Sequence, residues 1–131
     1  MNVCVYCGSR KGADPVFEEA ARAVGVAIAE RGWSLIYGGG NIGLMGTLAR
    51  TALENGAHVT GIIPTFLATK EIALDECSEL IEVESMHVRK ALMIERADLL
   101  IALPGGFGTL DELFEALTWR QQRSNGSRDD R

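Results

Sequence analysis

The sequence predicts an α/β fold in which one doubly wound, mostly parallel sheet carries helices on both faces. Short apolar segments of strand length alternate with segments of helical periodicity as far as about residue 120. Right-handed βαβ crossovers require that order. Glycine-bearing segments also follow predicted strands at residues 8–9, 38–43 and 104–109. Since such sheets bind ligands beyond the carboxyl ends of their strands, this convergence predicts a ligand site at that edge.

Local signals place the individual elements. The predicted strands cover residues 1–7, 33–37, 58–63, 79–83 and 98–103, and the predicted helices cover residues 15–30, 44–54, 86–97 and 110–120. The first helix has Asp14 as its N-cap, Pro15 in its first turn and Gly32 just past its end. Pro64 ends the third strand, and the stretch from there to the fourth strand is expected to be a loop or a broken helix.

Length and composition bound the number of domains. A chain of 131 residues with 47% hydrophobic residues has enough apolar side chains for one core and too little length for two domains. We expect residues 1–121 to form a single domain. Residues 122–131 contain no apolar side chain and cannot pack, so we expect a disordered polar tail.

The charge distribution excludes several classes of partner. The formal net charge is -5 and no Lys/Arg-rich run is present, so neither a nucleic acid nor a membrane surface is an expected partner. No apolar run approaches the roughly 20 residues of a membrane span, and the chain opens on a strand without a basic leader. A cytoplasmic location is expected. An anion site would have to be built locally, from backbone N–H groups and a few cations.

The cysteines predict packing rather than redox or metal chemistry. Cys4 and Cys7 form a C-x-x-C, but in a strand their odd spacing directs the two side chains to opposite faces. Cys77 stands alone, so we expect all three thiols to be reduced. The only histidines are His58 and His87, too few for a usual zinc site, and no metal is expected.

The segment 38–43 matches G-x-G-x-x-G between a strand and a helix. A dinucleotide site is not favoured, because the motif follows the second strand and no acidic residue ends the strand after it. A P-loop is excluded because no Lys-Ser/Thr pair follows the glycines. Two interpretations remain: a cradle the size of one phosphate group, or glycines that only permit a tight turn.

Residues 104–112, Pro-Gly-Gly-Phe-Gly-Thr-Leu-Asp-Glu, are more specific. Thr109 and Glu112 have the spacing of a capping box, which would by itself explain both residues. A cap needs none of the three glycines in this segment, however, which indicates that the backbone approaches a ligand closely. The N–H groups of Gly106, Gly108 and Thr109 would then point at a phosphate, with Glu112 within one helical turn.

Residues 85–90, Ser-Met-His-Val-Arg-Lys, open the helix before the fifth strand. From the pattern alone, Arg89 and Lys90 are typical of a solvated helix face. His87 is typical of a surface or packing position. No Ser-His-Asp order is visible in the chain.

Together, residues 38–40, 85–90 and 104–112 resemble the "Lonely guy" family of cytokinin-activating phosphoribohydrolases, formerly mislabelled lysine decarboxylases. The resemblance covers residue 1 to about residue 121. It implies a Rossmann-like fold and a homodimer that needs no metal or organic cofactor. It also implies hydrolysis of cytokinin riboside 5′-monophosphates or AMP to free base and ribose 5-phosphate.

The resemblance also implies roles for individual residues. Arg89 and Glu112 match the catalytic pair of the family. The matching substrate-contacting positions are Ser9, Gly39, Gly40, Glu71, Met86, Lys90, Gly106, Phe107, Gly108, Thr109, Leu110, Asp111 and Thr118. A carboxylate suits this reaction, because breaking an N-glycosidic bond develops positive charge on the ribose. Arg89 stays protonated at neutral pH and is assigned substrate positioning and electrostatic help.

Two other functions stay open at this point. A non-catalytic nucleotide or molybdenum-cofactor carrier of the same superfamily would keep the glycine segments without hydrolysis. A pyridoxal-phosphate decarboxylase would need a Schiff-base lysine, and the chain offers only Lys11, Lys70 and Lys90. The chain also departs from the family after residue 121, where relatives continue with another strand and helix; we expect a shortened C-terminus and an unpaired sheet edge.

Overall fold

The computed structural model describes residues 1–7, 15–69 and 72–103. Within these ranges, five parallel strands form one sheet in the order β4-β3-β2-β1-β5. The strands are β1 (Asn2–Tyr6), β2 (Ser34–Tyr37), β3 (Val59–Pro64), β4 (Glu79–Val83) and β5 (Leu99–Ala102). The predicted α/β fold with a parallel sheet is therefore confirmed. The N-cap at Asp14, the last predicted helix and the polar tail lie outside the described residues.

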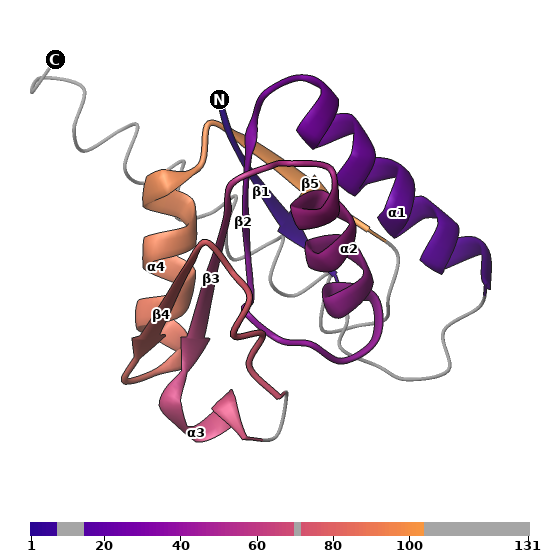
Figure 1. Cartoon of the computed structure of the whole chain (residues 1–131). Helices are drawn as coiled ribbons and strands as arrows, with labels where there is room; N and C mark the ends of the chain where they lie inside the picture. The colour runs from indigo at the N-terminus through magenta and orange to yellow at the C-terminus, as the bar shows by residue number, and fades with distance from the viewer. Residues whose placement is uncertain (8–14, 70–71, 104–131) are drawn as a thin grey trace, which may run out of the picture.

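Helices cover both faces of this sheet (Figure 1). On one face lie α1 (Pro15–Glu30) and α2 (Gly43–Glu54), and on the other lies α4 (Met86–Arg96). The chain passes from β1 through β4 toward one edge and then returns to place β5 on the far side of β1. Because βαβ crossovers are right-handed, a connection that runs back across the sheet must place its helix, α4, on the opposite face from α1 and α2.

The strands contribute side chains to two separate cores, as their period of two requires. Val3 and Val5 of β1 pack with α1 and α2, whereas Cys4 and Tyr6 pack on the side of α4. Cys7 belongs to the first core, so the two cysteines of the C-x-x-C lie on opposite faces as predicted. All three cysteines are free thiols.

Most element bounds agree with the sequence prediction to within a residue or two. The short helix α3 (Thr65–Ala68), between β3 and β4, is the one described element that the pattern left undecided. Gly32 ends α1 with a φ of 68°, and its N–H donates to the Ala29 carbonyl. None of the helices in the described ranges is long and apolar enough to cross a bilayer.

Helices α1 and α2 approach each other closely at Gly25. A methyl group built on Gly25 would lie 3.0 Å from the Leu48 carbonyl oxygen and 3.1 Å from Cβ of Thr51. The first of these atoms belongs to the backbone of α2, which cannot rotate away as a side chain could. A glycine in the middle of a helix is therefore explained here by packing between helices rather than by a turn.

Replacing Gly25 with alanine should destabilise the fold. Alanine gains about 1 kcal/mol of helix propensity over glycine, while overpacking costs about 1–3 kcal/mol. Because a backbone carbonyl blocks the methyl, we expect overpacking to win and the midpoint of urea unfolding to fall. A Gly25→Ala variant that is as stable as the wild type would show that the two helices separate at little cost.

Candidate functional site

The predicted ligand site lies at the carboxyl edge of the sheet, the lower end of the strands in Figure 1. Strands β1 and β5 are neighbours, with Tyr6 paired to Ala102. From β1 the strand order runs toward β4 on one side, whereas β5 lies on the other side, so the order changes direction between β1 and β5. Open parallel sheets bind ligands at such a point. Residues 38–43, called the glycine loop below, leave β2 at the same edge, and α4 begins there after β4.

Among the described residues, Arg89 is a buried cation near this edge, with 4% of its surface exposed. Its Nε donates to the Ile62 carbonyl of β3 at 2.9 Å, and its Nη2 donates to the Gly38 carbonyl at 2.5 Å. The prediction from pattern alone, a solvated helix face, is wrong for Arg89. The reason is that α4 packs on the sheet with this residue facing the ends of β2 and β3, where carbonyl oxygens can replace water as partners.

The start of α4 determines where Arg89 points. Ser85 has extended backbone and accepts a hydrogen bond on its Oγ from the Val88 N–H at 3.2 Å, so it is the N-cap. Met86 follows, and its sulfur lies 3.5 Å from Arg89 Nη1. Met86 and Arg89, both predicted site residues, are thus brought into contact by the first turn of one capped helix.

The other predicted site residues divide into two groups. Lys90 is half-buried on α4, Gly39 and Gly40 lie buried in the glycine loop, and His87 is exposed, as predicted for a surface residue. The remaining predicted site residues lie outside the described residues: Ser9, Glu71, Gly106, Phe107, Gly108, Thr109, Leu110, Asp111, Glu112 and Thr118.

Four successive carbonyls of the glycine loop accept hydrogen bonds from four different parts of the fold. The donors are Arg89 Nη2 to Gly38, Leu74 N–H to Gly39 at 2.9 Å, Tyr37 Oη to Gly40 at 3.0 Å, and Arg50 Nη1 to Asn41 at 3.2 Å. Arg50 also binds the side-chain oxygen of Asn41. Since its carbonyls are held by the protein, the loop has little freedom to rearrange.

Sequence reasoning did not find Leu74, Tyr37 or Arg50. Tyr37 ends a predicted strand directly before three consecutive glycines. A tyrosine at that position, with a hydroxyl group that can donate to the loop, was the signal that could have indicated its role. Arg50 and Leu74 are distant in sequence from the glycines they support. Only the packing of α2, and of the segment after α3, against the loop could reveal them.

Glycine is required at two further points of close approach. Gly39 has a φ of 80°, in the left-handed region that favours glycine. In β3, a methyl group on Gly61 would lie 2.7 Å from Cα of Gly39. The loop therefore lies directly against the neighbouring strand, and both glycines serve this contact.

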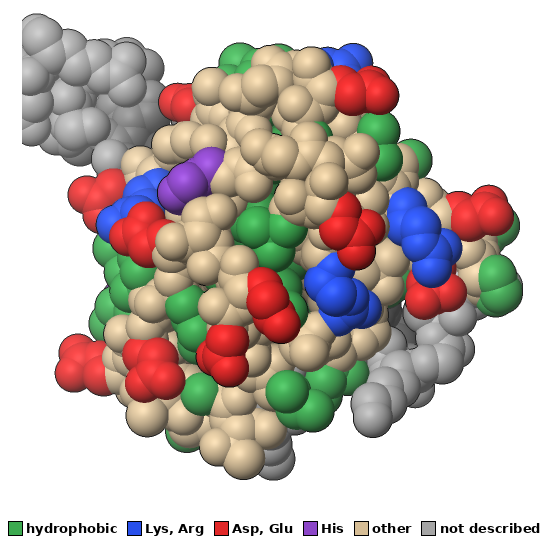
Figure 2. Space-filling view, viewed as in Figure 1, with side chains coloured by type: hydrophobic (Ala, Val, Ile, Leu, Met, Phe, Trp, Pro, Cys, Tyr) green, Lys and Arg blue, Asp and Glu red, His purple; other side chains and the backbone are tan. Residues whose placement is uncertain are grey.

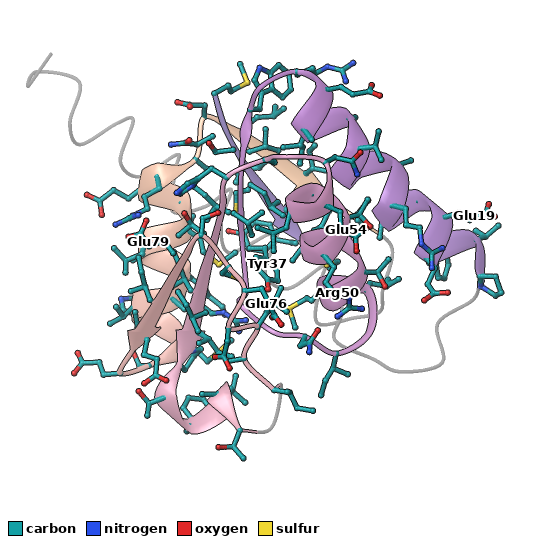
Figure 3. All side chains as sticks on the ribbon, viewed as in Figure 1. Glu19, Tyr37, Arg50, Glu54, Glu76 and Glu79 are labelled. Atoms are coloured by element: carbon teal, nitrogen blue, oxygen red, sulfur yellow. The ribbon has the colours of Figure 1, made fainter. Side chains whose placement is uncertain are left out.

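Tyr37 ties the glycine loop to the segment that carries Cys77. Its hydroxyl lies 3.6 Å from the sulfur of Cys77 and donates to Gly40. Figure 3 shows Tyr37 at the end of β2, with Glu76 and Arg50 near it in the same view. Burial, with Cys77 and Cys7 nearby, raises the pKa of Tyr37 above its ordinary value, and Arg50 opposes this. Burial likewise raises the pKa of the Cys77 thiol, while the contact with Tyr37 lowers it.

Among the described residues on the face shown in Figure 2, basic side chains do not gather into one patch. In Figure 2, acidic side chains are spread over the visible face and the basic ones lie singly among them. An anionic ligand would therefore depend on local groups such as backbone N–H donors. Among the residues that the structure describes, no group of three or more His, Cys, Asp or Glu side chains could hold a metal ion.

Comparison with known proteins places the chain in a family. The family model described as "possible lysine decarboxylase" matches residues 45–127, more than half of the chain. The chain belongs to this family. The resemblance drawn from the three motifs is confirmed, since that label is the former name of the proteins they resemble.

Relatives within the family carry phosphoribohydrolase names. A cytokinin riboside 5′-monophosphate phosphoribohydrolase of Oryza sativa subsp. japonica is 48% identical over 119 residues, covering 91% of this chain and 49% of the relative. One from Arabidopsis thaliana is 47% identical over 119 residues, covering 91% of this chain and 55% of the relative. The chain thus spans about half the length of the curated relatives it matches.

Solved structures share the fold. The molybdenum cofactor binding protein of Rippkaea orientalis superimposes with a TM-score of 0.76 at 26% identity, over 91% of this chain and 71% of that one. The molybdenum cofactor carrier protein of Chlamydomonas reinhardtii gives 0.77 at 24% identity, over 91% and 71%. These likenesses confirm the Rossmann-like architecture predicted from the family resemblance.

The shifted pKa of Tyr37 predicts how stability depends on pH. A folded-state pKa above the ordinary value of 10.0 means that the unfolded chain loses this proton first. The contribution of the protonated Tyr37 hydroxyl to the free energy of unfolding is therefore complete below pH 10. It is lost as the pH rises further, by at most about 1.4 kcal/mol per pH unit.

A Tyr37→Phe variant should be less stable than the wild type at pH 8 by about 1 kcal/mol, because the Gly40 carbonyl loses a donor. Above pH 10 its stability should fall less steeply than that of the wild type. Urea unfolding from pH 8 to pH 11 tests both statements. Parallel stability curves for the two proteins would contradict the raised pKa.

Proposed function

We propose that this chain hydrolyses the N-glycosidic bond of a nucleoside 5′-monophosphate, either a cytokinin riboside 5′-monophosphate or AMP. The observation that carries the proposal is the fixed guanidinium of Arg89, buried beside the glycine loop at the carboxyl edge of the sheet. Sequence identity of 46–48% to relatives named phosphoribohydrolases supports the same reaction.

In the proposed reaction, the bond from ribose C1′ to the base nitrogen breaks and its electron pair stays on the base. The oxygen of water bonds to C1′, and a proton from that water ends on the base. Positive charge develops on the ribose in the transition state, and a carboxylate close to it lowers the barrier. We assign that carboxylate to Glu112, with orientation of the water as its second role.

Arg89 holds its charge in one place rather than exchanging a proton. Guanidinium groups remain protonated at neutral pH, so general acid catalysis is not its role. Because carbonyls of the glycine loop and of β3 hold the group, its position is set before substrate arrives. A cation held in this way favours the negative charge of the departing base or of the phosphate without reorganisation during the reaction.

The glycine loop suits a substrate with one phosphate group. Its carbonyls at residues 38–41 already accept hydrogen bonds from the protein, so the N–H groups of the loop are the groups that it offers to an anion. The proposed contacts of Gly39 and Gly40 therefore use backbone N–H groups or Cα atoms. Ser9, Glu71, Met86, Lys90, Thr118 and residues 106–111 complete the proposed substrate contacts.

Further expectations are carried forward as parts of this proposal. The reaction needs no metal and no organic cofactor, since water and fixed charges suffice. The family resemblance implies a homodimer, and we propose that state for the active protein, in the cytoplasm and without a nucleic-acid partner. A single nucleotide-binding domain over residues 1–121 is the proposed unit.

A carrier function is the second candidate, and the likeness to the Rippkaea orientalis molybdenum cofactor binding protein favours it. That likeness is at 26% identity, against 48% for the phosphoribohydrolase of Oryza sativa. The hydrolase and the carrier differ in turnover, so an activity measurement separates them.

The deciding experiment incubates the purified chain with AMP and with isopentenyladenosine 5′-monophosphate, followed by chromatography of the products. Equal amounts of free base and ribose 5-phosphate from either substrate support the hydrolase and rank the two bases. If a monophosphate binds and no base is released, the carrier function replaces the proposal.

Substitutions at the proposed catalytic pair should separate chemistry from binding. Glu112→Gln keeps the size of the side chain but removes its charge, so turnover should be abolished while AMP still binds with nearly unchanged affinity. Arg89→Ala should weaken both turnover and binding, because its charge is assigned to substrate positioning. Calorimetric titration and base release measure the two effects; near-normal turnover of Glu112→Gln would overturn the assignment.

A further inference from the structure

Gly38 is a glycine whose backbone does not require one. The described glycines with φ in the left-handed region are Gly32, Gly39, Gly43 and Gly56, and Gly38 is not among them. Alanine could therefore adopt the same backbone conformation at residue 38 without strain. The reason for glycine at this position must lie in what surrounds it.

The surroundings of Gly38 are side-chain ends rather than backbone. A methyl group built on Gly38 would overlap Arg89 Nη2 and would lie 3.0 Å from Arg89 Cζ and 3.0 Å from the sulfur of Met45. Both side chains are long and flexible, so the main chain could stay in place if they moved. An added methyl group at residue 38 would thus be accommodated mainly by displacing the guanidinium of Arg89.

The same residue also anchors that guanidinium. The Gly38 carbonyl accepts from Arg89 Nη2, and the Ile62 carbonyl accepts from Arg89 Nε. Residue 38 therefore acts twice: its carbonyl attracts the guanidinium, and its missing side chain leaves the space that the group occupies.

We propose that Gly38 is a positioning residue that sets the location of the Arg89 guanidinium. The functional part of this inference rests on the proposed hydrolase activity, whereas the structural part does not. Gly38 itself needs no contact with substrate to act in this way. The inference separates it from Gly39, where the left-handed φ already accounts for glycine.

A small displacement of Arg89 should have a large effect on rate. Fixed catalytic groups lose about 10²-fold in rate when misplaced by about 1 Å. In Gly38→Ala we expect a decrease in kcat of about that size, since the cation no longer matches the charge that develops in the transition state. The temperature of unfolding should also fall, because the displaced guanidinium loses hydrogen bonds to buried carbonyls, so kcat is measured well below the unfolding transition.

The matched control is Gly25→Ala, the same substitution in the contact between α1 and α2. There the methyl group meets the backbone carbonyl of Leu48, and no atom of Arg89 is among its nearest neighbours. Gly25→Ala should lower the unfolding temperature and leave kcat of the folded protein unchanged. Both variants should therefore lose stability, but only Gly38→Ala should lower kcat.

The position of Arg89 can be observed without any turnover. At 14.2 kDa, the chain is small enough for NMR of arginine Nε–H groups. The signal of Arg89, assigned by its loss in Arg89→Lys, should be protected from exchange with water, because Nε donates to a buried carbonyl. In Gly38→Ala this signal should shift and lose its protection; in Gly25→Ala it should keep both its shift and its protection.

A double variant tests whether Gly38 acts through Arg89. Lysine has no forked end, so the methyl group in Gly38→Ala/Arg89→Lys meets no guanidinium, and kcat should equal that of Arg89→Lys alone. The same loss of kcat from Gly38→Ala in both backgrounds would overturn the inference. So would an unchanged Arg89 signal in Gly38→Ala, whatever the activity. If the wild type releases no base but the signal responds as expected, the positioning holds and the proposed function fails.

Discussion

The edge of the sheet where we propose the site depends on the hydrogen bonds from Arg89 to the carbonyls of Ile62 and Gly38. A guanidinium removed from water is costly unless polar groups replace the lost hydration. Here the replacements are carbonyls at or just beyond the ends of β3 and β2, and the donor comes from α4. One buried side chain therefore fixes the spacing between a helix on one face of the sheet and the loop that leaves the second strand.

The glycine loop shows how the rest of the fold supports this arrangement. Its carbonyls take donors from α4, from the segment after α3, from β2 and from α2. These donors come from both sides of the sheet, so the loop is positioned by the whole tertiary structure rather than by its own conformational preferences. Rigid loops on a parallel sheet allow backbone groups to meet a ligand without prior rearrangement.

The comparisons separate fold from function. Molybdenum cofactor proteins share the architecture at 24–26% identity, and plant phosphoribohydrolases share 46–48% of the sequence over about half of their own length. One scaffold thus serves proteins that carry a cofactor and proteins named for hydrolysis. The likeness of the sheets therefore does not distinguish the two functions, and the proposed function rests on particular side chains such as Arg89.

The sequence by itself determined the order of strands and helices, because side-chain periodicity and turn residues act over a few neighbouring positions. It also determined the opposite faces of Cys4 and Cys7, and its motifs identified the family. Only the tertiary structure decided that Arg89 is buried, because the same helical pattern places a charge in water or against carbonyls according to what packs beside it. For the same reason, only the fold explained Gly38: its need for glycine arises from a guanidinium 51 residues away in the chain.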